Sequence, residues 1–253
     1  MDLTLPVPNN PKTATQFLEE IATIDRLERD ERVLDAFLSG HVPPHIRTFA
    51  EISTSFYANG ACNVLKFNVL PDVVSIGTAD DYVRFPLTPL TAQRLCDKVS
   101  CSLPTTKISD LIWRVAQNKL EPLPWGPPYD ASMMSTERIV AHNGKVQAQL
   151  VCKDVGSITA GHKKDIVLTN LLASHDKSVA IYGWHRLNGV PIQPLYLGHE
   201  NLYADYAHSV RLVSLDCTLN DQATDLHTIF QDPTMCVSVS NEGPLRTLRQ
   251  PHA

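Results

Sequence analysis

The chain of 253 residues has little glycine, little positive charge and no long apolar run. It contains 11 glycines against 18 prolines, and its 22 basic and 27 acidic side chains give a formal net charge of −5. No stretch reaches the roughly 18 consecutive apolar residues of a membrane helix. This composition excludes collagen-like and disordered classes and gives no electrostatic footprint for nucleic acid. We therefore expect a globular protein with no nucleic-acid partner and no membrane segment.

The cysteines and the first residues indicate where the protein is expected to work. None of the six cysteines has the CxxC spacing of a redox or zinc motif, and a chain of this length does not need disulfides. Residues 1–8 carry an acid at Asp2 and neither the basic cluster nor the apolar run of a signal peptide. We predict a soluble, cytoplasmic protein whose cysteines are mostly small buried hydrophobic residues.

Proline-rich segments divide the chain. Residues 1–12 carry three prolines and are predicted to form an extended arm. Residues 121–130 are predicted to form a connector, because proline ends helices and interrupts central strands. This connector separates an N-terminal subdomain of helices and strands, residues 13–120, from a β-rich subdomain, residues 131–253.

Helical patterns gather in the N-terminal subdomain. Apolar residues recur at helical period over about 13–38, 89–101 and 105–118. After the connector, the dipeptide Asn143-Gly144 indicates a turn, and the pattern becomes mainly β. The predicted later elements are strands at 146–152, 165–169, 179–184, 192–197, 208–213 and 235–239, with a helix at about 221–231. The sequence thus predicts an α+β fold, with helices mainly in the N-terminal half and a mostly antiparallel β assembly in the C-terminal half.

Histidines concentrate in the β-rich half. Five of the ten histidines fall between residues 161 and 211, where they stand near predicted strand ends. Side chains at strand ends can converge at one rim of a sheet, and imidazole beside a carboxylate suits proton transfer at neutral pH. His162 with Asp165, and His208 with Asp205, have the spacing of such couples. The candidate catalytic residues are His162, Asp165, His199, Asp205, His208 and Arg211, and the candidate substrate-binding residues are Trp184, His185, Tyr203 and Ser209.

The same histidines also fit two other interpretations. His162, His199 and His208 with one acid would make a transition-metal site, although no HExxH, HxH or HxxxD spacing is present. Alternatively, the histidines only join loop ends by hydrogen bonds. No nucleophile motif accompanies them, and Ser209 is expected on the opposite face of its strand from His208. Our expectation is an acid–base centre without a cofactor, with the metal site as the alternative.

Residues 199–239 resemble the end of an L,D-transpeptidase catalytic domain. The resemblance rests on His199, on the run Ala207–Leu212 (AHSVRL) and on Asn220–Leu226 (NDQATDL). That family has an upstream histidine and a Ser-His-Gly-Cys-hydrophobic-Arg motif. This chain has Ser209 and Val210 in the neighbourhood of the family's nucleophilic cysteine. The resemblance implies a related β scaffold with altered or lost thiol chemistry.

These patterns predict an enzyme, a hydrolase or an acyl or peptidyl transferase, that acts on a small peptide-like or glycopeptide-like substrate. A metal-dependent enzyme that uses the same histidines is one alternative. A non-catalytic binding module is the other, in which the aromatic and proline-rich segment 123–129 presents a recognition surface.

Overall fold

The computed structural model describes all of residues 1–253, which form an α+β fold. The helices are α1 (Ala14–Glu20), α2 (Arg26–Leu38), α3 (Pro89–Lys98), α4 (Thr106–Val115), α5 (Thr136–Leu150) and α6 (Leu226–Gln231). The strands are β1 (Ala50–Ala58), β2 (Ala61–Val69), β3 (Ser75–Gly77), β4 (Tyr82–Arg84), β5 (Cys101–Ser102), β6 (Asn118–Lys119), β7 (Thr159–Ala160), β8 (Lys164–Ile166), β9 (Ser178–His185), β10 (Pro191–Glu200), β11 (His208–Ser209), β12 (Val213–Leu219) and β13 (Gln222–Asp225). Short 3-10 helices occur at η1 (Pro44–Ile46), η2 (Ala131–Met134), η3 (Asn170–Ala173) and η4 (Met235–Ser238).

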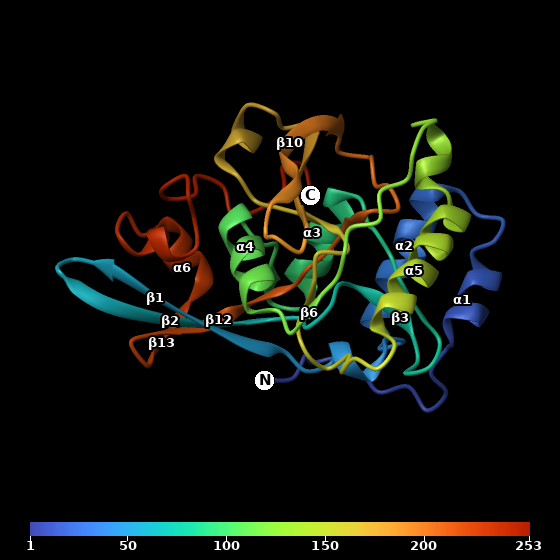
Figure 1. The fold of residues 1–253 in the computed structure, drawn as a ribbon, viewed down its shortest axis with the longest axis horizontal. Helices are drawn as coiled ribbons and strands as arrows, with labels where there is room; N and C mark the ends of the chain where they lie inside the picture. The colour runs from blue at the N-terminus through green and yellow to red at the C-terminus, as the bar shows by residue number, and fades with distance from the viewer.

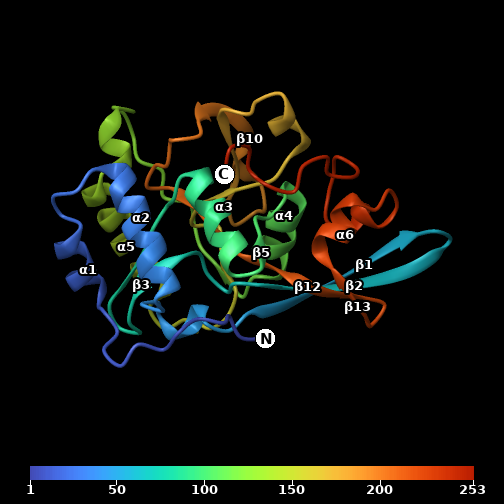
Figure 2. The same cartoon turned by 180° about the vertical axis from the view of Figure 1, so that it is seen from behind.

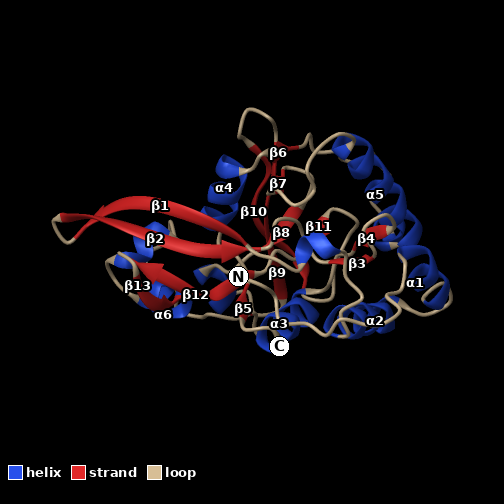
Figure 3. Ribbon diagram, turned by 90° about the horizontal axis from the view of Figure 1, so that it is seen from below, coloured by secondary structure: helices blue, strands red, loops and turns tan.

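A five-stranded sheet joins the two halves of the chain. Its strand order is β1-β2-β12-β13, with β5 also paired to β12, so residues 61–69 lie antiparallel to residues 213–219. The β1–β2 hairpin turns at Asn59 and Gly60, whose φ angles of 52° and 75° suit a two-residue hairpin turn. Figure 1 and Figure 3 show this hairpin projecting from one end of the molecule, opposite α1, α2 and α5.

A four-stranded sheet carries most of the predicted site residues. Its strand order is β10-β9-β8-β11, in which only the short β8–β11 pair is parallel. His185 is the last residue of β9, His208 is the first residue of β11, and His199 lies one residue before the end of β10. His162 lies two residues before β8 begins. These histidines therefore stand at or beside strand ends, as the sequence predicts.

The helices of the N-terminal half follow their local signals closely. Helices α3 and α4 occupy the predicted segments, and the Thr105 hydroxyl caps α4 by accepting the Ile108 N–H at 3.1 Å. The single helix predicted over 13–38 is instead two helices. The Asp25 carboxylate accepts the N–H groups of Leu27 and Glu28 and so begins α2 afresh.

Helix α5 overturns two predictions. The turn predicted at Asn143-Gly144 lies inside α5, and so does most of the strand predicted at 146–152. The Asn143 side chain accepts the Arg84 N–H at 3.2 Å and donates to the Tyr82 carbonyl at 3.0 Å. These tertiary hydrogen bonds hold Asn143 against β4, so they outweigh its local preference for a turn. A helix of 15 residues therefore lies in the C-terminal half.

One hydrophobic cluster of 50 buried residues runs from Leu3 to Leu245 and takes side chains from both larger sheets. Phe67 of β2 and Ile181 of β9 are both fully buried in it. The strand ends that carry the histidines are thereby anchored on a common core. None of the helices is long and apolar enough to cross a membrane.

Candidate functional site

Strands β8 and β11 distribute the predicted site residues over two faces of their sheet. In the parallel register Lys164 pairs with His208, and Asp165 pairs with Ser209. Because neighbouring residues of a strand point to opposite faces, Lys164 and His208 share one face while Asp165 and Ser209 share the other. The predicted site thus separates into two groups of side chains. The His208 cluster consists of Lys164, His199, Tyr203, Asp205 and His208, and the Asp165 cluster consists of Ser109, His162, Asp165, Ser209 and Arg211.

Asp205 is the fixed carboxylate of the His208 cluster. Its Oδ1 accepts the backbone N–H groups of Ala207 at 2.8 Å and His208 at 3.2 Å, and its Oδ2 accepts Lys164 Nζ at 2.9 Å. Burial alone raises the pKa of the Asp205 carboxyl, but His208, Lys164 and the N–H donors outweigh it and hold the pKa well below its usual range. Asp205 is therefore an ionised, immobile acceptor.

His208 lies beside this carboxylate with its ring fully buried. Its Nε2 is 3.9 Å from Asp205 Oδ1, and neither ring nitrogen has a hydrogen-bond partner. Burial lowers the pKa of His208 to about 3, so the imidazole is neutral at pH 7 and keeps a free lone pair. Buried imidazoles normally find partners for their nitrogens, so this one requires an explanation.

Two half-buried rings cover His208. The rings of His199 and Tyr203 are stacked, with their centres 4.0 Å apart and their planes at 16°. Their centres lie 6.2 Å and 5.5 Å from the centre of the His208 ring. The Tyr203 hydroxyl is 3.4 Å from Asp205 Oδ2. The stacked pair therefore separates His208 and Asp205 from solvent.

A layer of buried side chains lies behind the His208 cluster. Lys164 Nζ lies 5.4 Å from the centre of the Trp184 ring, and Trp184 itself has a left-handed φ of 57°, which is strained for a tryptophan. The His142 ring packs against Trp184 and Tyr206, with ring centres 6.5 Å and 5.0 Å away, and these two rings also contact each other. Lys163 donates to the Tyr206 carbonyl, and burial lowers the pKa of its amine to about 7.

His142, Lys163 and Lys164 are not among the candidate site residues that the sequence patterns indicate. The sequence does contain a pattern that marks the two lysines, because Lys163 and Lys164 stand together where an apolar strand begins. His142 gave no signal, because its segment was assigned to a turn.

In the Asp165 cluster, the Asp165 carboxylate lies within hydrogen-bond distance of two hydroxyl groups. Ser109 donates to Asp165 Oδ2 at 2.8 Å, and the Ser209 hydroxyl lies 3.0 Å from Oδ1. The buried Arg211 donates to the backbone carbonyls of Leu70 at 2.9 Å and Thr159 at 2.7 Å. Arg211 thus ties Leu70, just after β2, to Thr159 of β7, and its role in binding an anion from the substrate stays a prediction.

His162 pairs with a carboxylate distant in the sequence. Its Nε2 is 3.0 Å from Asp72 Oδ1, while Arg84 donates to Asp72 Oδ2 at 2.6 Å and 2.9 Å. The predicted couple of His162 with Asp165 is therefore not formed. Burial lowers the pKa of His162 to about 4, although Asp72 opposes this. Gly161, with a φ of 95°, makes the turn before His162, where a Cβ would lie 2.2 Å from the Leu120 carbonyl oxygen.

His185 forms a third, separate pair. Its Nε2 lies 2.8 Å from Asp110 Oδ1, which also accepts the Tyr182 hydroxyl at 2.8 Å. The imidazole is stacked on Trp113, with ring centres 5.7 Å apart. His185 was predicted to bind substrate, yet its side chain is only 5% exposed. It lines a cavity of about 10 Å³ together with members of the Asp165 cluster, which is about the space of one water molecule.

No group of three or more His, Cys, Asp or Glu side chains has an arrangement that suits a metal ion. His162 lies in a different group from His199 and His208, so the alternative metal set is divided between the two clusters.

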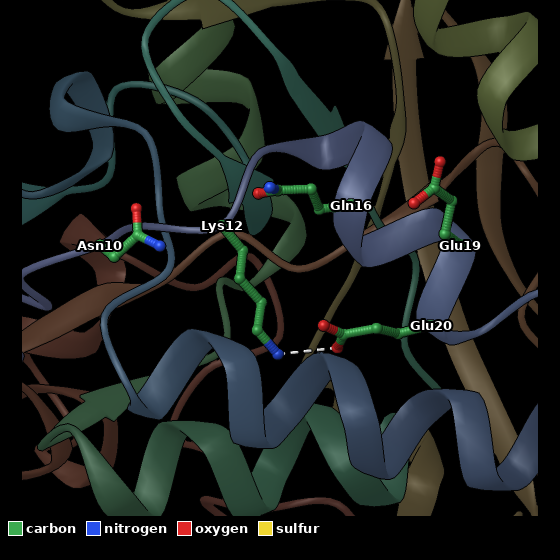
Figure 4. A pocket seen from close by; sticks show the side chains of 5 residues that line it. All are labelled: Asn10, Lys12, Gln16, Glu19 and Glu20. Carbon is green, nitrogen blue, oxygen red and sulfur yellow. Dashed lines mark hydrogen bonds and ion pairs between the residues drawn. The ribbon is translucent and has the colours of Figure 1, made fainter.

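A broad depression of about 530 Å³ lies elsewhere, on α1 and the arm before it. Its lining side chains, drawn in Figure 4, are Asn10, Lys12, Gln16, Glu19 and Glu20. The ion pair between Lys12 and Glu20, at 2.7 Å, spans it. None of the predicted site residues lines this depression.

Comparisons with family models, with curated proteins and with solved structures found no match for this chain.

Proposed function

We propose that the protein is a hydrolase of small, peptide-like esters or amides and that the His208 cluster supplies its acid–base chemistry. The observation that carries the proposal is the state of His208. Its ring is buried, both nitrogens lack partners, and an ionised carboxylate is fixed 3.9 Å away. His142 also has two unpartnered nitrogens, but no carboxylate oxygen lies within 4.0 Å of its ring nitrogens, so the nearby carboxylate distinguishes His208. A general base needs a free lone pair, and a nearby carboxylate stabilises the charged form that it reaches.

The role of His208 follows from its charge state. As a neutral imidazole it can take a proton from a water molecule, and Asp205 would stabilise the imidazolium that forms. The proton would then pass to the leaving group. Burial is the main cause of the low pKa of His208, so an opening of the His199–Tyr203 stack that admits water would raise that pKa toward neutrality.

Water is the nucleophile that this arrangement favours. The Ser209 hydroxyl faces Asp165 on the other side of the sheet, so it is not available to His208. No cysteine belongs to the cluster, and burial raises the pKa of Cys217, a thiol near it in the sequence, to about 12. Hydrolysis is therefore favoured over transfer through an acyl-enzyme. The resemblance to L,D-transpeptidases stays a prediction.

The substrate would meet His199 and Tyr203 first. These two rings are half-buried and stacked, so they can contact a flat, partly apolar group such as a peptide bond with small side chains. Peptide-like substrates are therefore favoured over highly charged sugars.

The test is hydrolysis of 4-nitrophenyl acetate and of N-acetyl-Ala-Ala-4-nitroanilide by the wild type and by His208→Asn. A general acid–base group contributes about 10²–10⁴-fold, so His208→Asn should lower kcat/KM at least about 100-fold. Circular dichroism and the melting temperature check that the variant is folded.

His227→Asn is the matched control. His227 is half-buried in α6 and also has an unpartnered ring nitrogen, but it lies outside both clusters. Its replacement should leave kcat/KM within about twofold. Equal activity of a folded His208→Asn and the wild type would exclude His208 as the acid–base group.

A further inference from the structure

Three arginines surround η2, the short helix Ala131–Met134, and none of them forms an ion pair. Arg26 Nη1 donates to Met134 Sδ at 2.7 Å, and Arg29 Nη1 donates to the Met134 carbonyl at 2.9 Å. Arg138 Nη2 donates to Ser132 Oγ at 3.3 Å. Arg26 and Arg29 come from the first turn of α2, and Arg138 comes from the first turn of α5. We call Arg26, Arg29 and Arg138 the arginine cluster.

The arginine cluster adjoins the His208 cluster. The Tyr206 N–H donates to the Met133 carbonyl at 3.0 Å, which joins η2 directly to the segment between β10 and β11. Figure 1 and Figure 2 both show that segment passing beside the ends of α2 and α5. Burial raises the pKa of the Tyr203 hydroxyl, and the charge of Arg26 is among the groups that oppose the rise. Arg26 therefore lies within electrostatic reach of the rings that cover His208.

The guanidinium groups have donors to spare. Arg29 is 3% exposed, and its Nε and Nη2 are buried without a hydrogen-bond partner. Arg138 Nη1 is likewise buried and unpartnered. The neighbouring Asp30 accepts the Thr88 N–H at 2.7 Å through its Oδ2, and its Oδ1 has no partner. Burial raises the pKa of the Asp30 carboxyl, while the Thr88 hydrogen bond and Arg29 oppose the rise. Asp30 and Glu137 are the carboxylates that act on Arg29, yet neither forms an ion pair with it, so the unpartnered guanidinium donors are left for an anion.

We propose that the arginine cluster binds an anionic group, a carboxylate or a phosphate, on the molecule that the His208 cluster hydrolyses. A guanidinium presents paired N–H donors that match the oxygens of both groups. The inference rests on the proposed hydrolytic function, and it names the class of substrate as an acidic small molecule. The anion would be held on the α2–α5 side while the bond to be cleaved lies at His199 and Tyr203.

Binding is tested by calorimetry with inorganic phosphate and with succinate, at an ionic strength held constant with sodium chloride. Arg26→Met and Arg138→Met are the variants, because both side chains are half-buried and their replacement leaves the buried Arg29 in place. Arg32→Met is the matched control, since Arg32 is an exposed arginine of the same helix, paired with Glu28 at 3.1 Å.

The wild type and Arg32→Met should show one saturable site, and each test variant should bind at least about tenfold more weakly, the loss expected for one charge-assisted contact. The probe that binds with the higher affinity shows whether the anionic group of the substrate is a phosphate or a carboxylate. Equal affinity in all four proteins, or saturable binding of neither probe, would overturn the proposal.

A kinetic measurement separates this inference from the proposed hydrolysis. The ratio of kcat/KM for mono-4-nitrophenyl glutarate to that for 4-nitrophenyl butyrate should fall about tenfold in Arg26→Met and stay at the wild-type value in Arg32→Met. His208→Asn should bind the anion as the wild type does, because its ring does not belong to the arginine cluster. Arginine-dependent binding of the anion without hydrolysis would refute the proposed hydrolase function and support the anion site. Hydrolysis with an unchanged ratio in Arg26→Met would support the hydrolase function and refute the anion site.

Discussion

Replacement of His142 by phenylalanine should make the protein more stable. The side chain is 0% exposed, and neither of its ring nitrogens has a hydrogen-bond partner. Its neighbours are the rings of Tyr206 and Trp184, with centres at 5.0 Å and 6.5 Å. Phenylalanine keeps a flat ring in this aromatic space and removes both unpaired polar atoms.

The size of the effect follows from two opposing terms. A buried polar atom without a partner costs about 1–3 kcal/mol, and His142 has two of them. The larger phenyl ring costs about 1–3 kcal/mol in overpacking. The net gain in the free energy of unfolding should be about 1–3 kcal/mol, and each kcal/mol raises the Tm of a chain of this length by about 2–4 °C.

Urea denaturation at pH 7 and differential scanning calorimetry measure this gain. His175→Phe is the control, because the His175 side chain is exposed, and its free energy of unfolding should change by less than about 0.5 kcal/mol. A loss of more than about 1 kcal/mol in His142→Phe would refute the reasoning, since it would mean that the nitrogens of His142 make stabilising contacts.

Two further predictions concern the buried charges. Lowering the pH from 6 to 5 should destabilise the protein by about 3 kcal/mol, because His162 and His208, with native pKa values of about 4 and about 3, stay neutral while the unfolded chain protonates both. The contribution of the two neutral histidines to the free energy of unfolding is fully present above pH 6.5 and is lost as the pH falls. Urea titrations at pH 7, 6 and 5 measure it. A free energy of unfolding that does not change with pH would contradict the burial of the two imidazoles. Asp72→Ala should cost about 3–5 kcal/mol in urea denaturation at pH 7, because it leaves Arg84 buried without its counter-charge. A loss below about 1 kcal/mol would show that the Asp72 pair is hydrated.

The sequence predicts those helices whose position depends on nearby residues, such as capping groups and apolar spacing. Helix α4 lies within the segment 105–118 that the helical period predicts, and Thr105 caps its first turn. Helix α5 could not be predicted in this way. Its Asn143 is held by Arg84 and Tyr82, which lie about sixty residues earlier in the chain, so no window around Asn143 contains the deciding contacts.

The candidate site shows the same division. The placement of histidines at strand ends was predictable from strand patterns, and so was the neighbourhood of Asp205 and His208. The partner of His162 was not predictable, because Asp72 precedes it by 90 residues. The separation into two clusters depends on the register of β8 with β11, which a sequence pattern alone does not specify.

The pairing of β2 with β12 also determines when the chain can fold. Val69 pairs with Val213, so the five-stranded sheet closes a loop of well over a hundred residues, and such long-range contacts form slowly. During synthesis, the β1–β2 hairpin leaves the ribosome long before its neighbour exists. Its edge, including Phe67, then remains without a partner strand, which favours association with other chains. We expect refolding yields to fall as protein concentration rises, and chaperones that shield unpaired strands to restore them.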